Sequence, residues 1–499
     1  MKKLLYIDLF CGAGGTSTGV ERAKYNGNKC AEVIACVNHD PNAIKSHAAN
    51  HPNAVHYTED IRTLDLTELS DLVRTRRKEK DSLIVLWASL ECTNFSNAKG
   101  GQPRDADSRT LAEHLFRYVE AIDPDYIQIE NVREFMSWGD LDESGKPVSK
   151  DKGRLYLKWV KNICSYGYSF SNRILNSANY GAYTSRERFF GIFAKKGLPI
   201  SFPEPTHSKN GTHDMFDSLE KWKPVREVLD LEDYGTSIFG RKKPLSESTL
   251  KRIYAGLQKF CTKGEDTFLV KYNSMSKTGK CVPPSIDEPS PVIACQNRLA
   301  VAHAYFLSKQ YGGSVDGKNI SIDQPSGTIT CIDHHALVSM QFMDNQYGNG
   351  RPTTIDTPCG TIVGNPKQRL VTVSSDHFLL NPQYSCSGSS IDKPCFTLIA
   401  RMDKRPPSLV SVDKHGTVCM SEHDSPMTYK IKQFMQEHGI SDISMRMLTV
   451  NELKRIMGFG DSYVLVGTQA EKKKYIGNAV EVNMSMALCR NLYESINVN

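Results

Sequence analysis

The sequence predicts an α/β fold built on a sheet of buried parallel strands, and two observations in residues 1–200 carry this prediction. Short apolar runs rich in β-branched and aromatic residues recur at 4–10, 32–38, 83–89, 126–132 and 188–194. Polar segments compatible with helices separate these runs, as at 107–122. Buried strands that alternate with helices are the pattern of a parallel sheet covered on both faces.

The composition is that of a soluble globular chain. Hydrophobic residues make up 39% and charged residues 24% of the 499 residues. No stretch approaches the roughly 18 apolar residues that a membrane helix needs. The N-terminal MKKLLYIDLF begins like a signal peptide, but Asp8 interrupts a short apolar run, which favours a buried strand. We therefore expect a cytoplasmic protein with no membrane partner. The net charge of +6 permits a polyanionic partner without establishing one.

The 14 cysteines are scattered along the chain without a C-x-x-C pair. Most lie in apolar surroundings, as Cys36 and Cys295 do. This usage is typical of buried free thiols in a reducing compartment. Because zinc ligands are usually clustered in the sequence and these are not, we expect no metal site.

The pattern changes after Lys196, where three prolines within 199–205 mark a boundary. Farther along, an Ile-Asp-x-Pro unit recurs at intervals of 36, 33 and 36 residues, beginning at Ile286, Ile322, Ile355 and Ile391. A β-like run follows each proline, so the repeat predicts a β-rich region between about 265 and 415. That region is either a scaffold or a surface that recognises a ligand. Amphipathic helical patterns return at 428–439 and 448–458, and a final helix is expected at 480–496.

A glycine-rich turn, DLFCGAGG at 8–15, directly follows the first predicted strand. Glycines between a strand and a helix let the backbone approach a ligand, and the start of the helix favours an anion. The spacing is not G-x-G-x-x-G and the turn lacks a P-loop lysine, so a dinucleotide or a triphosphate is disfavoured against another nucleoside ligand. The alternative is a tight structural turn.

Polar groups follow two further segments of this region. Asn38 and His39 end the second predicted strand, where nucleoside-binding folds often place a group near the ribose. Asp60 and Ile61 follow a third short segment and could contact an adenine edge. The alternative is that these are ordinary polar residues at strand ends.

Reactive side chains follow the later strands. Cys92 lies just past a buried strand and precedes a Gly- and Arg-containing loop, a position where α/β folds place reactive groups. Glu130 ends the next strand and suits acid–base work, although it could instead cap a helix or form an ion pair. Arg186 and Arg188 are two residues apart at the start of a strand and should share a face. They could bind a carboxylate or phosphate, or form a solvated edge.

Taken together and in order, these segments resemble the DNA cytosine-5 methyltransferase family. The resemblance covers about 1–200 and 445–499 and rests on IDLFCGAGG, ECTNFS, DSR, ENV, LNSANYGAYTSRERFFGIF, RMLTVNE, MGFGDSY and YIGNAV. It implies a Rossmann-like catalytic domain that binds S-adenosyl-L-methionine, formed by 1–200 and completed by 470–499. It also implies a β-rich target recognition domain at 201–445 that contains the repeats, and a segment at 446–469 that supports it.

The resemblance also implies roles for particular residues. Cys92 would be the nucleophile that attacks C6 of a cytosine flipped out of duplex DNA. Glu130 would hold the N3 edge of the base, and Arg188 with Arg186 would stabilise that arrangement. The cofactor would contact residues in three regions of the chain, namely Asp8, Phe10, Gly12, Gly14, Gly15, Asn38, His39, Asp60, Ile61, Asn478 and Ala479.

Three positions depart from the family pattern. Glu91 stands where the family has a proline before its nucleophile, and a carboxylate beside a thiol disfavours the thiolate. Asn38 stands in place of an acidic ribose ligand, and Thr184 in place of a glutamine. We hypothesise that Glu91 lies near the cytosine edge and tunes the choice of substrate; unchanged rate and base preference in Glu91→Pro would refute this.

Two other functions remain open from the sequence alone. One is an RNA cytosine-5 methyltransferase acting on transfer RNA, although about 250 residues between Arg188 and Arg446 favour the reading of duplex DNA. The other is a catalytically impaired DNA-binding relative, which Glu91 alone motivates.

The expected partners are double-stranded DNA and, acting separately, a cognate restriction endonuclease. We expect a monomer of bacterial or phage modification type. Candidate base readers include Asn297, Arg298, Asn365, Lys367, Gln368, Arg369, Arg401, Lys404 and Arg405.

Overall fold

The structure is a computed structural model of the whole chain. It describes residues 1–79, 81–90, 111–140, 153–213, 218–230, 233, 235–260, 420–437 and 440–497, together with short strands between 300 and 414. Among the described residues, no helix has both the length and the hydropathy of a membrane span.

A seven-stranded sheet forms the centre of the N-terminal part, in the order β5-β4-β1-β6-β7-β9-β8. Its strands are β1 (Lys3–Leu9), β4 (Ala31–Val37), β5 (Val55–Tyr57), β6 (Ser82–Ser89), β7 (Tyr126–Asn131), β8 (Tyr168–Asn176) and β9 (Glu187–Lys195). The five strands from β5 to β7 are parallel. All five predicted strands are present. The order reverses between β1 and β6, and in such sheets ligands bind at the carboxyl ends of the strands beside this point.

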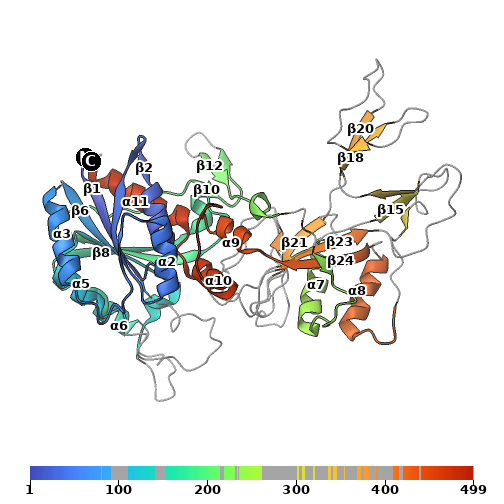
Figure 1. Ribbon diagram of the computed structural model, residues 1–499, viewed down its shortest axis with the longest axis horizontal. Coiled ribbons are helices and arrows are strands. Elements are labelled where there is room, and N and C mark those ends of the chain that lie inside the picture. Colours follow the sequence, from blue (N-terminus) through green and yellow to red (C-terminus); the bar gives the residue numbers. More distant parts are fainter. Residues whose placement is uncertain are drawn as a thin grey trace.

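Helices cover both faces of this sheet (Figure 1), which explains why its strands read as continuous apolar runs. In β1, Leu5 and Ile7 pack toward α3 (Thr67–Glu79), α5 (Leu115–Ile122) and α6 (Arg154–Ser165). The alternate residues Leu4 and Tyr6 pack on the other face with α1 (Gly15–Arg22) and α11 (Val482–Asn497). Side chains point alternately to opposite faces along a strand, so each residue of β1 contributes to one of two cores.

The sheet is mixed, and the prediction of a parallel sheet was wrong for β9, which runs opposite to the other six strands. β9 pairs antiparallel with both β7 and β8. The chain passes from β8 to β9 through the short helix η4 (Ser177–Tyr180), which is too short to return the chain to the opposite end as a parallel crossover requires. β8 was not predicted, because it is an edge strand whose middle residues are exposed and polar.

The two ends of the chain meet where α1 packs against α11 (Figure 1). The backbones approach closely at Gly19, where a Cβ would overlap Ser485 Oγ and the carbonyl oxygen of Val482. The backbone of Lys2 also exchanges hydrogen bonds with the Asn497 side chain. The C-terminal helix therefore covers the same core as the first strand.

We expect Gly19→Ala to lower the free energy of unfolding by about 2 kcal/mol, because the added methyl forces apart two packed helices. The better helix propensity of alanine offsets only about 1 kcal/mol of this cost. Urea denaturation followed by circular dichroism measures the change. Gly460→Ala is the matched control, since a Cβ there meets its nearest atom at 3.6 Å. Equal stability of the two variants would contradict the close packing.

A second sheet lies in the C-terminal half, in the order β13-β24-β14-β23-β21-β22. Its strands are β13 (Thr236–Ser237), β24 (Ile440–Met447), β14 (Ala300–Ala302), β23 (Ser408–Lys414), β21 (Asp376–Leu380) and β22 (Ser389–Ser390). The helices α7 (Glu247–Phe260) and α8 (Pro426–Glu437) pack together beside it (Figure 1), and Ile253, Ile431 and Ile443 share their core. The four Ile-Asp-x-Pro units lie outside the described residues.

Shorter elements complete the described chain. One three-stranded sheet contains β15 (Phe306–Lys309), β16 (Asn319–Ile320) and β17 (His335–Val338). Another contains β18 (Gln341–Asn345), β19 (Thr353–Thr354) and β20 (Gln368–Thr372). The remaining strands are β2 (Lys24–Tyr25), β3 (Asn28–Lys29), β10 (His207–Ser208), β11 (Thr212–His213) and β12 (Ser218–Lys221). The remaining helices are α2 (Pro41–Asn50), α9 (Val450–Ile456), α10 (Gln469–Asn478), η2 (Arg133–Ser137) and η5 (Val225–Val228).

A buried ion pair joins β24 to the helix that follows it. Arg446 Nη1 and Nη2 donate to the two carboxylate oxygens of Glu452 at 3.0 and 2.9 Å, and Arg446 Nε lies 3.2 Å from Asp233. Glu452 also accepts from the backbone N–H of Thr449 and Asp230, and with Thr449 it forms the capping box of α9. The RMLTVNE motif thus connects the second sheet, the 230–233 segment and the start of α9.

Candidate active site at the carboxyl ends of the parallel strands

The glycine-rich turn follows β1 and adopts a conformation that most residues avoid. Phe10, Gly12 and Gly14 have φ of +58°, +52° and +100°. A Cβ at Gly12 would meet nothing within 4 Å, so the turn leaves open space there, whereas Gly14 is covered by the Tyr463 hydroxyl. That hydroxyl also donates to the carbonyl oxygen of Ala13. The turn is therefore held from one side and open at Gly12.

Asp8 lies beneath the turn and is fully buried. Its Oδ2 accepts from Ser17 Oγ at 2.8 Å, whereas its Oδ1 has no hydrogen-bond partner among the described atoms. Burial raises the pKa of this carboxyl to about 8. Asp8 was expected to bind the cofactor. In the structure its side chain is buried and holds Ser17 at the start of α1, so it presents no exposed atom for direct contact.

The end of β4 carries the next group of expected site residues. Asn38 Oδ1 accepts from the backbone N–H of Asp40 at 2.9 Å, so its oxygen turns back into its own loop beside His39. Asp40 caps α2 through the backbone N–H of Asn42 and also accepts from the Tyr475 hydroxyl at 3.0 Å. Through Asp40, the sequence-distant helix α10 is tied to the strand end where a ribose was expected.

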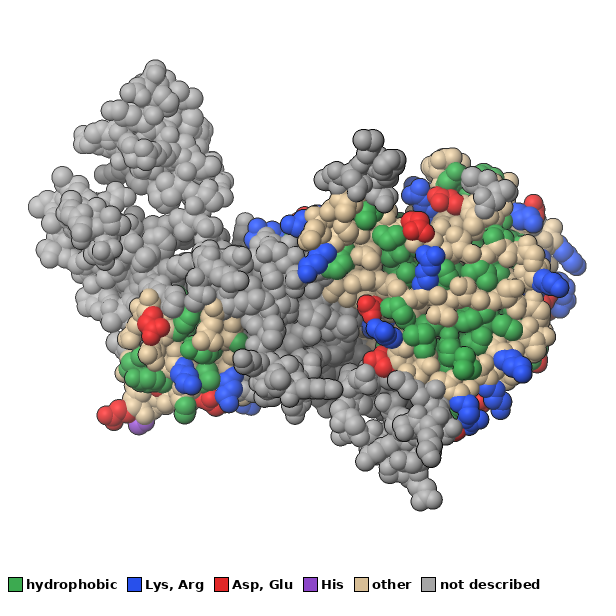
Figure 2. Space-filling model, turned by 180° about the vertical axis from the view of Figure 1, so that it is seen from behind, with side chains coloured by type: hydrophobic (Ala, Val, Ile, Leu, Met, Phe, Trp, Pro, Cys, Tyr) green, Lys and Arg blue, Asp and Glu red, His purple; other side chains and the backbone are tan. Residues whose placement is uncertain are grey.

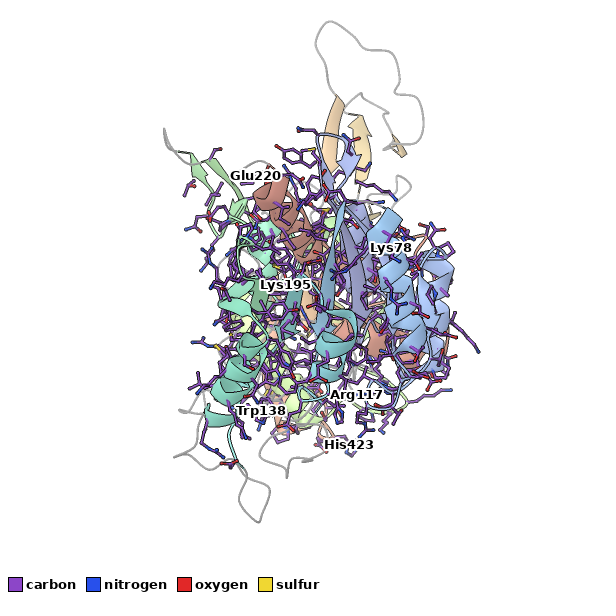
Figure 3. The ribbon with its side chains drawn as sticks, turned by 90° about the vertical axis from the view of Figure 1, so that its left-hand side faces the viewer. Lys78, Arg117, Trp138, Lys195, Glu220 and His423 are labelled. Atoms are coloured by element: carbon purple, nitrogen blue, oxygen red, sulfur yellow. The ribbon has the colours of Figure 1, made fainter. Side chains whose placement is uncertain are left out.

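Side chains outside the Asp60–Ile61 turn hold it by hydrogen bonds. The Asp60 carboxylate accepts from Arg62, which lowers its pKa. Arg117, labelled in Figure 3, donates to the Ile61 carbonyl oxygen at 3.1 Å, and the Tyr118 hydroxyl does so at the same distance. Ile61 itself is buried. The structure therefore holds this turn rigidly, with the Asp60 carboxylate at its surface.

Asn478 and Ala479 lie at the end of α10, next to the start of α1. A Cβ at Gly15 would lie 3.0 Å from Ala479 Cβ and would overlap the carbonyl oxygen of Val480. The close approach brings the YIGNAV segment against the glycine-rich turn although the two are more than 450 residues apart in the sequence. The structure thus brings the first and last groups of expected cofactor residues together.

A carboxylate and two guanidinium groups form a buried cluster at the carboxyl end of β7. Glu130 Oε1 lies 3.3 Å from Arg188 Nε and 4.0 Å from Arg186 Nη2. The side chains of Glu130, Arg186 and Arg188 are 7%, 4% and 11% exposed, so water screens these charges little. Burial raises the pKa of Glu130, and the two guanidinium groups oppose this rise. Both arginines therefore face the Glu130 carboxylate, and neither forms a solvated edge.

The strand that leads to Cys92 ends beside this cluster. Ser89 of β6 pairs in register with Glu130 of β7, and Asn131 Nδ2 donates to the carbonyl oxygen of Leu90 at 3.3 Å. Glu91 and Cys92, together with the loop that follows, lie outside the described residues. The chain therefore enters the segment of the expected nucleophile at the edge of the sheet that holds Glu130.

Sequence reasoning missed a second buried carboxylate. Glu481 is 1% exposed, caps the start of α11 by accepting from the backbone N–H of Met484 at 2.9 Å, and interacts electrostatically with Arg186. Burial raises its pKa to about 7. Glu481 directly follows the YIGNAV motif and precedes the predicted C-terminal helix. This position between a motif and a helix was the sequence signal that could have identified it as a site residue.

The raised pKa of Glu481 predicts a dependence of stability on pH. The folded state holds this proton up to about pH 7 and the unfolded state releases it near the ordinary value of 4.5. The contribution to stability is therefore complete below pH 4.5 and is lost as the pH rises to about 7, by about 3 kcal/mol. Relative to Glu481→Gln, the wild type should lose this amount in denaturant titrations across that window. Glu494→Gln, on the surface of the same helix, should not alter the pH dependence; a parallel course of wild type and Glu481→Gln would contradict the shift.

Comparisons with known proteins agree with this geometry. Residues 4–280 and 334–494 match the model of C-5 cytosine-specific DNA methylases. The Type II methyltransferase M.XorII of Xanthomonas oryzae pv. oryzae is 30% identical over 210 residues, which cover 41% of this chain and 44% of that protein. M1.HphI of Haemophilus parahaemolyticus is 29% identical over 211 residues, which cover 42% and 50%. The matches thus span about half the length of these curated relatives. The solved Dnmt2 methyltransferase of S. pombe aligns with 99% of this chain and 100% of its own at a TM-score of 0.46 and 14% identity.

The family match identifies the mixed sheet, the glycine-rich turn and the carboxylate–arginine cluster as parts of an S-adenosylmethionine-dependent methyltransferase fold. Within that class, the chain belongs to the C-5 cytosine-specific DNA methylase family, because the family model matches well over half of its residues.

The residues present fit S-adenosylmethionine on one observation of the structure. The turn at Gly12 combines a positive φ with open space where a side chain would stand, as a backbone in close contact with a nucleoside requires. The polar ends of β4 and the Asp60 turn lie along the same edge of the sheet, because these strands are parallel.

Proposed function

We propose that the protein is a DNA cytosine-5 methyltransferase that transfers a methyl group to a cytosine within a specific duplex sequence. The observation that carries this proposal is the Glu130–Arg188 ion pair at 3.3 Å, buried at the end of the strand beside the one that leads to Cys92. Burial raises the pKa of the Glu130 carboxyl, against the opposing effect of two guanidinium groups, so the group holds its proton to higher pH than an exposed glutamate does. That property suits a group that binds the N3 edge of a pyrimidine.

Each residue has a part in the proposed chemistry. The Cys92 thiolate adds to C6 of the cytosine, and Glu130 donates a proton toward N3 so that the ring accepts the electron pair. Arg186 and Arg188 keep Glu130 in place. The added thiolate makes C5 nucleophilic, and bound S-adenosylmethionine supplies the electrophilic methyl group. Loss of the C5 proton and release of Cys92 then restore the aromatic ring. The base must leave the helix for this reaction, because its C5 and C6 are inaccessible in stacked DNA.

The cofactor residues are proposed from their placement along one edge of the sheet. Phe10, Gly12, Gly14 and Gly15 would form the turn around the methionine and sugar. Asn38, His39, Asp60 and Ile61 would border the nucleoside, and Asn478 with Ala479 would close the site from α10. Asp8 would act from beneath by holding Ser17 and so the start of α1.

The division of the chain is also proposed. Residues 1–200 with 470–499 would form the catalytic domain, 201–445 the β-rich target recognition domain, and 446–469 the segment between them. The contacts of Arg446 support the last assignment, since they join the second sheet to α9.

On the face shown in Figure 2, Lys and Arg side chains of the described surface are scattered among acidic and hydrophobic ones, so charge alone does not mark where DNA binds. We propose a monomeric cytoplasmic enzyme with duplex DNA as its partner and a separate cognate restriction endonuclease.

A comparison of substrates tests this function. Purified protein is incubated with tritiated S-adenosylmethionine and either mixed-sequence duplex DNA or transfer RNA, and incorporated label is counted. We expect label in duplex DNA alone. Labelling of transfer RNA alone would establish the RNA enzyme instead. If neither is labelled, a duplex carrying 5-fluorocytosine distinguishes a slow enzyme, which forms a covalent adduct, from a DNA-binding relative, which forms none.

A further inference from the structure

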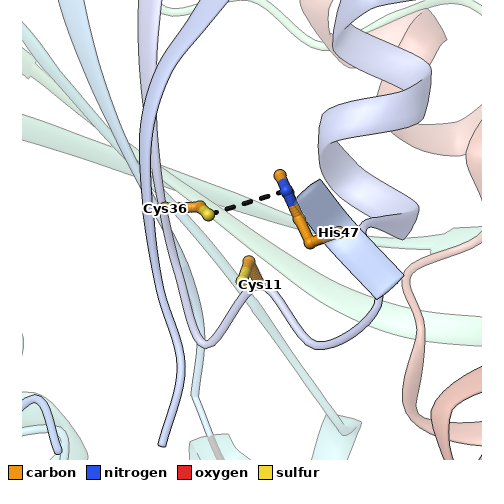
Figure 4. Close-up of side chains that lie close together, drawn as sticks. All are labelled: Cys11, Cys36 and His47. Carbon is orange, nitrogen blue, oxygen red and sulfur yellow. Dashed lines mark hydrogen bonds between the residues drawn. The ribbon is translucent and has the colours of Figure 1, made fainter. Parts of the chain in front are cut away.

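Two thiols and an imidazole gather in the interior, away from the Glu130 cluster. Cys11 comes from the glycine-rich turn, Cys36 from β4 and His47 from α2 (Figure 4). All three are buried, and their Sγ and ring nitrogen atoms lie within 4.8 Å of one another. This group was not predicted from the sequence, because its residues are 25 and 11 positions apart; the lack of clustered ligands was the reason for expecting no metal site.

The spacing of the donor atoms suits a tetrahedral cation. Cys36 Sγ lies 3.6 Å from His47 Nδ1. A zinc ion with ordinary bonds to sulfur and nitrogen would hold such a pair about 3.5 Å apart. His56 Nε2 lies 2.9 Å from the same Nδ1 atom, so a further nitrogen donor is adjacent to the three clustered residues. Two sulfurs and two imidazole nitrogens form a common zinc ligand set.

The outer contacts of His47 orient its ring for this purpose. Ser17 Oγ, which donates to Asp8 Oδ2 at 2.8 Å, lies 2.9 Å from His47 Nε2 and can accept a hydrogen bond from it. In the tautomer with the proton on Nε2, the lone pair of Nδ1 is available to a cation beside Cys36. Metal-binding histidines usually donate their second ring N–H in this way, and such partners tune the affinity of the site.

We propose that Cys11, Cys36 and His47 bind a zinc-like soft divalent cation, with His56, 2.9 Å from His47 Nδ1, as an adjacent further donor. The cation would join the glycine-rich turn to β4 and α2, and so would fix the backbone that precedes Gly12. Because Cys11, Cys36 and His47 are all buried, we expect the site to be structural. This inference does not depend on the proposed function.

Cobalt substitution tests the site. Metal-free, reduced full-length protein is titrated with Co²⁺, and absorption is followed in the ultraviolet and visible. We expect one equivalent to produce thiolate-to-metal charge transfer and the intense visible bands of tetrahedral cobalt, and one equivalent of Zn²⁺ to bleach both. Zn²⁺ should also raise the melting temperature of the metal-free protein, since it binds the folded state.

Variants show which residues bind. Cys36→Ser and His47→Gln should lose the one-equivalent spectrum and the zinc-dependent rise in melting temperature. Cys489→Ser is the matched control, because it removes a buried thiol of α11 outside the cluster and should keep both signals. The proposal is overturned if wild type shows no tetrahedral spectrum, if Cys36→Ser retains it, or if Cys11 and Cys36 form a disulfide that excludes the metal under reducing conditions. The wild-type titration decides the matter even if a variant fails to fold.

Discussion

Cys92→Ser is expected to lower methyl transfer to duplex DNA by at least about a thousandfold, because the hydroxyl is a far weaker nucleophile toward C6 than a thiolate. The measurement is the initial rate of label transfer from tritiated S-adenosylmethionine under saturating cofactor. Binding of the DNA should remain, since the substitution changes one atom. A covalent adduct with a 5-fluorocytosine duplex, visible as a shifted band on a denaturing gel, should disappear in the variant.

Cys164→Ser provides the control for this experiment. Its thiol lies half-buried in α6 on the outer layer of the domain, so label transfer and adduct formation should match those of the wild type. Retention of the wild-type rate by Cys92→Ser would refute the covalent route and with it the assignment of the nucleophile. Glu91 makes this the most informative position, because we expect a carboxylate next to the thiol to disfavour the thiolate unless it points away or a cation offsets it.

Glu130→Gln is expected to lower the rate of methyl transfer by about two to three orders of magnitude, because an amide can contact N3 but cannot deliver a proton to it. It should also alter the pH profile. Burial raises the pKa of Glu130, so the wild type keeps the donating form to higher pH, and its rate should fall as the pH rises through that pKa. The variant should lack this fall. Rates across the pH range, with cofactor affinity measured separately, check both expectations.

Glu187→Gln is the matched control for Glu130→Gln. Glu187 precedes Arg188 in the same strand, but its side chain is 47% exposed and its nearest cation is Arg133 at 3.9 Å. The rate and the pH profile of this variant should remain those of the wild type. If Glu130→Gln matched it, the buried carboxylate would be a structural counterion of Arg186 and Arg188 and not a catalytic group.

Local sequence was enough to predict much of the fold. The five predicted strands of the first sheet are all present, because strands buried on both faces are apolar at nearly every position. The pairing of Glu130 with Arg186 and Arg188 was also predictable in part, since residues two apart in a strand share a face. The edge strand β8 was missed, because an edge strand with exposed polar residues lacks such an apolar pattern.

Other features of the site depended on contacts between distant residues. Asp8 was expected among the ligand contacts, yet the approach of Ser17 and His47 places its carboxylate in the interior. Glu481 gains its raised pKa from burial between segments that are far apart in the sequence. Neither environment can be inferred from neighbouring residues, because burial in the core is a property of the packed sheet and helices.

The sequence by itself determined five strands of the first sheet, the glycine-rich turn and the motifs that place the chain in its family, because each of these is written in a short run of neighbouring residues. Only the tertiary structure decided that the last helix covers the first strand, that β9 runs against its neighbours, and that Cys11, Cys36 and His47 meet. The physical reason is that these features arise from packing between segments separated by tens to hundreds of residues. Local hydrophobic patterns predict single strands and helices and do not show which of them pack together.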